Sequence, residues 1–108
     1  MSTDTILIPG IDTPISRVAL GTWAIGGWMW GGPDDENGVR TIHAALDDGI
    51  NLIDTAPVYG FGHSEEVVGR ALAEKPHKAF VATKLGLNWT DDKPEDRKVF
   101  RDSRPARI

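Results

Sequence analysis

Three residues that could act together in acid–base chemistry are spaced along the middle of the chain: Asp54, Tyr59 and Lys84. Tyr59 is the only tyrosine of the sequence. A phenol has an ordinary pKa of about 10, so it donates a proton poorly near neutrality unless its surroundings favour the phenolate. An adjacent ammonium does so and lowers that pKa, while a carboxylate keeps the ammonium charged and in place. The trio therefore predicts a general acid or base for a carbonyl or alcohol oxygen.

Three short segments would have to position these side chains. Residues 17–22, 50–55 and 79–84 are short and largely apolar, which is typical of strands buried on both faces of a parallel sheet. Asp54 lies near the end of the second segment, and Lys84 ends the third. On spacing alone an alternative stays open, in which Asp54 caps a turn and Lys84 is only solvated.

Two segments between these strands have the spacing of amphipathic helices. The first would begin at Asp34 or Asp35, either of which could cap it, and would stop at Gly49. The second would begin with Ser64 as its cap and end at Pro76. The predicted apolar faces are Val39, Ile42 and Leu46 in the first helix and Val67, Val68, Ala71 and Leu72 in the second.

The order of these elements predicts an α/β fold with a parallel sheet and right-handed crossovers. Residues 5–16 before them suggest a small hairpin around a Pro-Gly turn, residues 23–33 form a long glycine- and tryptophan-rich loop, and residues 85–108 show no further pattern. Each strand–helix repeat takes roughly 30 residues, and a full barrel of eight needs about 250. We therefore expect a partial TIM (β/α)8 barrel: an N-terminal hairpin plus the first three parallel strands and two helices.

Composition argues against several classes of protein and excludes several kinds of site. The formal net charge of −4 argues against nucleic-acid binding, which needs clustered lysine and arginine. Because the chain has no cysteine, disulfides, thiolate zinc sites and cysteine nucleophiles are excluded. The sequence shows neither a secretory signal nor an apolar run long enough for a membrane span, so we expect a cytoplasmic protein with no membrane partner.

Several spaced motifs resemble one protein family. Residues 51–60 (Asn-Leu-Ile-Asp-Thr-Ala-Pro-Val-Tyr-Gly) and residues 62–65 (Gly-His-Ser-Glu) closely resemble the signature of the aldo-keto reductases. Residues 81–84 (Val-Ala-Thr-Lys) resemble the segment that bears the family's catalytic lysine, and residues 20–23 (Leu-Gly-Thr-Trp) resemble its first barrel strand and cofactor-facing loop. The resemblance runs from about residue 18 to residue 108, and it is strongest to the bacterial branch with long first loops.

This resemblance implies an oxidoreductase that reduces aldehyde or ketone carbonyls with NADPH. Tyr59 would donate a proton to the substrate carbonyl, Lys84 would lower the pKa of Tyr59, and Asp54 would pair with Lys84. The residues placed beside the cofactor, at its nicotinamide end, are Gly21, Thr22, Trp23 and Asp54. The preference for NADPH (NADP) over NADH is likewise implied by the family.

The sequence also departs from the family's pattern. The family's fourth catalytic residue, a histidine after the following strand, has no counterpart here, and the residues that bind the carboxamide and the adenosine phosphate come later in the family's chain. We therefore expect a truncated chain that is inactive alone. The alternatives are a non-catalytic fragment that completes a barrel with another chain, self-association through the exposed edge of residues 80–83, and a channel-associated regulatory subunit.

The remaining candidates are the histidines and two tryptophans. His63 lies beside the site but is expected to be a helix-start residue, and His77 is expected to face solvent in a turn. His43 lies within the first helix, where it is expected either to pack or to be partly exposed. The three histidines are too scattered to predict a metal site. Trp28 and Trp30 either form a wall of the substrate pocket or cover the mouth of the barrel, and both interpretations stay open.

Overall fold

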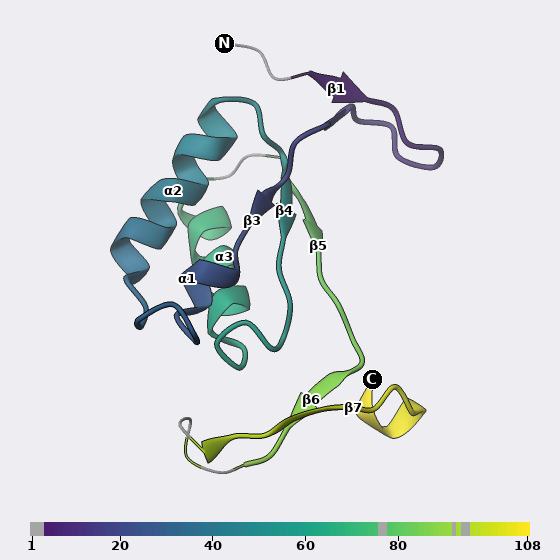
Figure 1. The fold of residues 1–108 in the computed structure, drawn as a ribbon. Coiled ribbons are helices and arrows are strands. Elements are labelled where there is room, and N and C mark those ends of the chain that lie inside the picture. The colour runs from purple at the N-terminus through teal and green to yellow at the C-terminus, as the bar shows by residue number, and fades with distance from the viewer. Residues whose placement is uncertain (1–3, 76–77, 92, 94–95) are drawn as a thin grey trace.

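A computed structural model describes residues 4–75, 78–91, 93 and 96–108. The predicted order of strands and helices is confirmed (Figure 1). The elements are β1 (Thr5–Ile6), β2 (Ile15–Ser16), β3 (Leu20–Gly21), α1 (Trp23–Gly26), α2 (Asp35–Asp47), β4 (Leu52–Asp54), α3 (His63–Glu74), β5 (Phe80–Ala82), β6 (Leu87–Trp89), β7 (Val99–Arg101) and a 3-10 helix (Pro105–Arg107). The helix end predicted at Pro76 and the turn predicted at His77 lie outside the described residues.

The sheet that carries the candidate site contains β3, β4 and β5 in that order, and both pairings are parallel. Leu20 pairs with Ile53, which pairs in turn with Val81. The strands are shorter than the predicted segments, although flanking residues such as Thr22 and Thr55 still donate hydrogen bonds to the neighbouring strand. In parallel strands the carboxyl ends meet at one edge of the sheet; we call that edge, after Gly21, Asp54 and Ala82, the rim.

Helix α2 begins and ends as its sequence predicts. The Asp34 side chain accepts a hydrogen bond from the Asn37 amide at 3.2 Å, and acidic residues in the first turn suit the positive end of the helix dipole. At the other end Gly49 takes a left-handed conformation with φ of 88° and donates its amide to the Leu46 carbonyl. Asp34, rather than Asp35, is therefore the cap.

Helix α3 begins differently from the prediction. Its N-cap is Gly62, with φ of 95°, and the helix starts at His63. The prediction that Ser64 caps this helix was wrong, because the Ser64 side chain points into the protein and is fully buried. Its hydroxyl bonds to other elements rather than to the amides of its own first turn.

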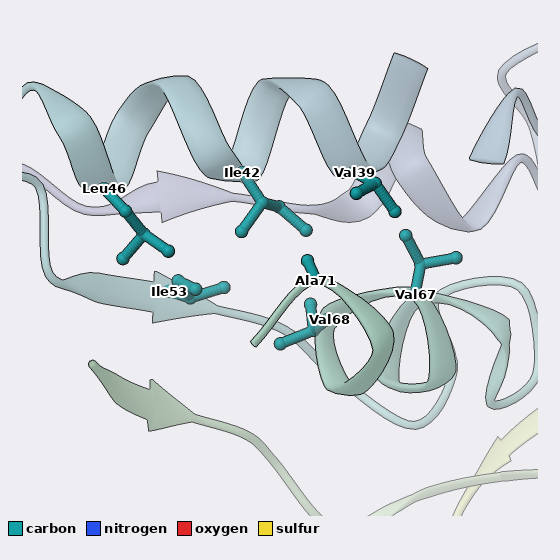
Figure 2. Close-up of a cluster of buried hydrophobic side chains, with 7 residues drawn as sticks. All are labelled: Val39, Ile42, Leu46, Ile53, Val67, Val68 and Ala71. Atoms are coloured by element: carbon teal, nitrogen blue, oxygen red, sulfur yellow. The ribbon is translucent and has the colours of Figure 1, made fainter. Parts of the chain in front are cut away.

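Helices α2 and α3 cover one face of the sheet, and the core lies between them (Figure 1). Figure 2 shows the apolar side chains of α2 pointing toward α3 and toward Ile53 of β4. The members of this buried cluster are Val39, Ile42, Leu46, Ile53, Val67, Val68 and Ala71. The predicted apolar faces are therefore confirmed, with Leu72 partly buried against the same cluster.

Hairpins lie at opposite ends of the sheet (Figure 1). The predicted hairpin of β1 and β2 is confirmed, and Asn51 joins it to the start of β4 by accepting from the Ser16 amide at 2.9 Å. At the rim end, β6 and β7 form an antiparallel pair that the sequence did not predict, since residues 85–108 show no further pattern. The long loop of residues 23–33 likewise contains the short helix α1. No helix among the described residues is long and apolar enough to cross a membrane.

Candidate active site

The predicted proximity of Asp54 and Lys84 is confirmed at the rim. Asp54 is the last residue of β4, and Lys84 follows the neighbouring strand β5 by two residues. The Lys84 ammonium donates hydrogen bonds to Asp54 Oδ1 at 2.6 Å and to the Thr55 carbonyl at 2.7 Å. The cation is therefore held by the Asp54 side chain and by the backbone carbonyl of the next residue, Thr55.

Opposing effects act on the charge of Lys84. Partial burial lowers its pKa, because a less hydrated site disfavours the ammonium. Hydrogen bonding and Coulombic attraction from Asp54 and from the Tyr59 hydroxyl outweigh that effect and raise the pKa of Lys84 above its ordinary value of 10.5. Lys84 is therefore a cation throughout the neutral range.

Tyr59 lies in the loop between β4 and α3 and faces the same cation. The Lys84 Nζ atom is 5.1 Å from the centroid of the Tyr59 ring. On the Trp23 side, the indole stacks on the phenol with centroids 6.1 Å apart and planes 20° apart. Trp30 then meets Trp23 edge-on at 5.7 Å. The three residues of the predicted trio are thus together on one rim.

The loop that carries Tyr59 is shaped by consecutive backbone turns. The Tyr59 amide donates to the Ala56 carbonyl at 3.1 Å, and the Gly62 amide donates to the Pro57 carbonyl at 2.7 Å. The Tyr59 carbonyl then accepts from the Ser64 amide at 3.1 Å, so the loop is tied to the first turn of α3. Gly60 and Phe61 both take positive φ, which lets the chain reverse within a few residues.

A cluster of buried hydroxyls behind the rim was missed by sequence reasoning. Ser64 Oγ donates to Thr22 Oγ1 at 2.7 Å and lies 2.9 Å from Thr55 Oγ1. Thr22 Oγ1 in turn donates to the Asp54 carbonyl at 3.0 Å. The network joins the ends of β3 and β4 to the start of α3, so it supports the backbone that presents Asp54. The only signal in the sequence was a hydroxyl residue at each of these three ends.

A hollow opens between Tyr59 and Lys84. Its volume is about 140 Å³. The residues that line it are Ala56, Pro57, Val58, Tyr59, Lys84, Leu85 and Leu87. Apart from the phenol and the ammonium these side chains are apolar, and such a pocket would hold a small molecule and direct its oxygen to the polar groups.

The residues expected beside the cofactor differ in exposure. The space around the Gly21 α-carbon is open, and the Trp23 side chain is 42% exposed at the rim. Thr22 is fully buried, and its hydroxyl is engaged in the network behind the rim. An open backbone beside a flat aromatic ring suits the approach of a planar group such as a nicotinamide, with Thr22 supporting this surface from behind.

His63 and His43 form hydrogen bonds with residues other than Asp54, Tyr59 and Lys84. His63 Nε2 is 2.6 Å from Asp35 Oδ1 and so joins the start of α3 to the start of α2. His43 is partly exposed, which is one of its two predicted states, and its Nε2 atom lies 2.9 Å from the Ala71 carbonyl. Across the described part of the chain, no group of three or more histidine, aspartate or glutamate residues is arranged to hold a metal ion. Trp28 packs on Phe61 at 5.0 Å, whereas Trp30 lies at the rim beside Trp23.

Comparison with known proteins agrees with this geometry. A family model described as "Aldo/keto reductase family" matches residues 17–105. The chain is 50% identical to the aldo-keto reductase YhdN of Bacillus subtilis over 110 aligned positions, which cover 100% of this chain and 31% of that protein. It is 44% identical to the NADH-specific methylglyoxal reductase of Escherichia coli, covering 90% of this chain and 32% of the relative.

Solved structures agree as well. The chain superposes on a glycerol dehydrogenase of Gluconobacter oxydans with a TM-score of 0.88 and 85% identity, covering 96% of this chain and 32% of the other. The expected partial barrel is confirmed by this match, and the chain spans about a third of the length of these relatives. With its signature segments in place on the rim, the chain belongs to the aldo-keto reductase family.

Proposed function

We propose that the whole protein, meaning this chain together with the rest of a family-length barrel, reduces aldehyde or ketone carbonyls with NADPH. The observation that carries the proposal is the Lys84 ammonium, held 2.6 Å from Asp54 Oδ1 and facing the ring of Tyr59. That arrangement supports a phenol that gives up its proton beside a cation. In the reverse direction the same groups would accept a proton from an alcohol.

The cofactor would supply two electrons and one hydrogen, as a hydride, to the carbonyl carbon. In this chain Gly21 and Trp23 would contact its nicotinamide end, Thr22 would support them, and Asp54 would border the same surface. The choice of NADPH rests on the family, and one relative, 44% identical, is named an NADH-specific reductase. Turnover should therefore be measured with both NADPH and NADH.

This chain would supply the second hydrogen of the reaction, as a proton. Tyr59 would donate its hydroxyl proton to the carbonyl oxygen, so that the carbonyl becomes an alcohol and the phenol becomes a phenolate. Lys84 would stabilise that negative charge, and Asp54 would keep Lys84 oriented toward it. Proton exchange with solvent would then restore the phenol for the next turnover.

The substrates would be small. The hollow beside Tyr59 and Lys84 has a volume of about 140 Å³ in this chain, and it would form the part of the pocket that receives the carbonyl oxygen. Two relatives carry names that refer to small oxygenated compounds, methylglyoxal and glycerol. We therefore propose small aldehydes and ketones, with the corresponding alcohols in the reverse direction.

Replacing Tyr59 with phenylalanine tests this proposal. Tyr59→Phe removes one oxygen and keeps the ring that stacks on Trp23. In the whole protein we expect kcat to fall on the order of 10²- to 10⁴-fold, the range for loss of a positioned acid, while the dissociation constant of the cofactor stays unchanged. Retention of wild-type turnover would refute Tyr59 as the proton donor.

The alternative function, a non-catalytic piece that associates with another chain, is favoured by one observation on the isolated 108 residues. Val81 of β5 is 47% exposed, and β5 lies at one end of the three-stranded sheet in the described part of the chain. Such an edge favours pairing with another strand. We expect isolated 1–108 to show negligible NADPH turnover and to self-associate in size-exclusion chromatography; a monomer with slow amide exchange in β5 would contradict the self-association.

A further inference from the structure

Two glycines let two backbones cross next to Tyr59. Gly26 is the last residue of α1 and is buried against the Tyr59 loop. A Cβ atom at position 26 would lie 2.5 Å from the Tyr59 carbonyl carbon and 2.6 Å from its oxygen, far inside van der Waals contact. From the opposite side, a Cβ atom at Gly60 would collide with the Gly26 carbonyl oxygen. Any side chain at position 26 must therefore displace the backbone of Tyr59 relative to α1.

The partner in this contact is fixed to the sheet. The Thr22 amide donates to the Asp54 carbonyl at 3.1 Å, and the Gly26 amide donates to the Thr22 carbonyl at 3.3 Å. Helix α1 is thus anchored to the end of β4, the strand that carries Asp54. A residue that touches α1 takes its position relative to Asp54, and through Asp54 relative to Lys84.

The same helix also holds the ring of Tyr59. Trp23, the first residue of α1, stacks on the phenol at 6.1 Å, while the last residue of α1 meets the Tyr59 backbone. Tyr59 therefore has two supports on α1, one for its ring and one for its carbonyl. The carbonyl support is a contact between main-chain atoms, so it leaves less freedom than a contact between flexible side chains.

We propose that Gly26 is a positioning residue for Tyr59: its missing side chain lets α1 set the distance between the phenol and the Lys84–Asp54 pair. This inference rests on the proposed function, in which Tyr59 is the proton donor. Gly26 itself touches neither substrate nor cofactor in this account. A displacement of the donor on the order of 1 Å can lower a rate by up to about a hundredfold.

The next residue provides a matched control. A Cβ atom at Gly27 would lie 2.5 Å from the Pro33 amide nitrogen and 2.7 Å from the Gly32 carbonyl carbon, so it is crowded to the same degree. Its φ of 83° adds backbone strain for any other residue. Yet the atoms it meets belong to the turn before α2 and not to the Tyr59 loop. Gly27→Ala therefore disturbs the same helix end without pressing on Tyr59.

The experiment compares Gly26→Ala and Gly27→Ala in the whole protein. For Gly26→Ala we expect kcat to fall by about tenfold to a hundredfold, with an unchanged cofactor dissociation constant and a larger solvent deuterium isotope effect on kcat, because proton transfer becomes slower. For Gly27→Ala we expect a lower denaturation midpoint but a nearly wild-type kcat and isotope effect. Equal losses of kcat in the two variants, or an unchanged isotope effect in Gly26→Ala, would overturn the inference.

Three further outcomes are decisive. If Gly26→Ala does not fold, Gly60→Ala takes its place in the experiment, because it presses on the same contact from the other side. If neither variant folds while Gly27→Ala does, the contact is a requirement of folding, and the positioning role is overturned. Tyr59→Phe is measured in parallel. An active Tyr59→Phe would refute the proposed function, whereas an inactive Tyr59→Phe beside a fully active Gly26→Ala would refute this inference alone.

Discussion

Ile53 and Asp54 are neighbours in β4, yet they belong to different regions of the molecule. Ile53 is 1% exposed and packs under α2 and α3, whereas the Asp54 side chain is 45% exposed at the rim and holds Lys84. Because successive side chains of a strand point to opposite faces, one step along the chain separates the core from the candidate chemistry. Substitutions under the helices should therefore change stability, and substitutions at the rim should change turnover.

The largest expected effect is on turnover, from a change at the rim. Lys84→Met keeps the length of the side chain and removes its charge, so the phenolate of Tyr59 loses its stabilising cation. In the whole protein we expect kcat to fall on the order of 10²- to 10⁴-fold, with little change in stability, since exposed ion pairs contribute about 0–1 kcal/mol. Steady-state kinetics with urea denaturation would measure both.

Lys75→Met is the matched control for that change. Lys75 also forms an ion pair, with Asp47, but at the far end of α3 from the rim. This variant should keep wild-type turnover. Equal losses of turnover in the two lysine variants would contradict a specific role for Lys84.

The next largest effect is on stability, from a change in the core. Ile42 of α2 is fully buried against α3 and the sheet. Ile42→Ala therefore leaves a cavity and should lower the free energy of unfolding by about 2–5 kcal/mol. The protein that stays folded should keep its kcat. As a control, Ile6→Ala removes a side chain that is 42% exposed and should change stability by no more than about 0.5 kcal/mol. Equal losses of stability in Ile42→Ala and Ile6→Ala would contradict the place given to Ile42 in the core.

A smaller loss of stability is expected from the hydroxyl network, which lies between the two regions. Ser64→Ala removes the partner shared by Thr22 and Thr55, both fully or almost fully buried. Leaving buried hydroxyls short of a partner costs about 1–3 kcal/mol, which chemical denaturation would detect. Thr41→Ala, which removes an exposed hydroxyl from α2, should have almost no effect. An unchanged midpoint for Ser64→Ala would contradict the role given to this network.

The smallest effect is the pH dependence of the Lys84–Asp54 pair. Burial works against the Lys84 charge, but Asp54 and Tyr59 raise the pKa of Lys84 above 10.5 in the folded protein. A raised pKa stabilises the fold fully below the unfolded value, and that contribution is lost as the pH rises through the folded value. The stability difference between wild type and Lys84→Met should thus be constant at neutral pH and shrink above pH 10.5. A stability difference that grows above pH 10.5 would contradict the raised pKa of Lys84.

Much of the fold could be predicted because local pattern and tertiary burial agree. The apolar spacing of α2 and α3, Asp34 as a cap and Gly49 as a stop all act within one or two turns of a helix. Helix α1 lies in a glycine-rich segment, and the hairpin of β6 and β7 lies in a largely polar one. Neither segment has a sustained apolar repeat that would predict a helix or a strand. The hairpin is also supported by contacts from distant segments, such as Trp89 on Phe61 at 5.3 Å.

The candidate site likewise contains residues that the sequence predicts and residues that it does not. Asp54, Tyr59 and Lys84 were recognisable because strand ends of a parallel sheet share one rim. The roles of Ser64 and Gly26 depend on which distant backbone lies against them, and no local pattern carries that information. Ser64 stands where a helix cap belongs, but its partners Thr22 and Thr55 come from other elements. Gly26 is one of several glycines in a loop, and only its distance to Tyr59 distinguishes it.

The most direct test of the central claim is a double-mutant cycle between Tyr59 and Lys84 in the whole protein. If the phenol and the ammonium act as one proton-donating unit, Tyr59→Phe and Lys84→Met should each remove most of kcat/KM, and the double variant should be scarcely slower than the slower single variant. If the two losses instead multiply in the double variant, the residues act independently and the account is wrong.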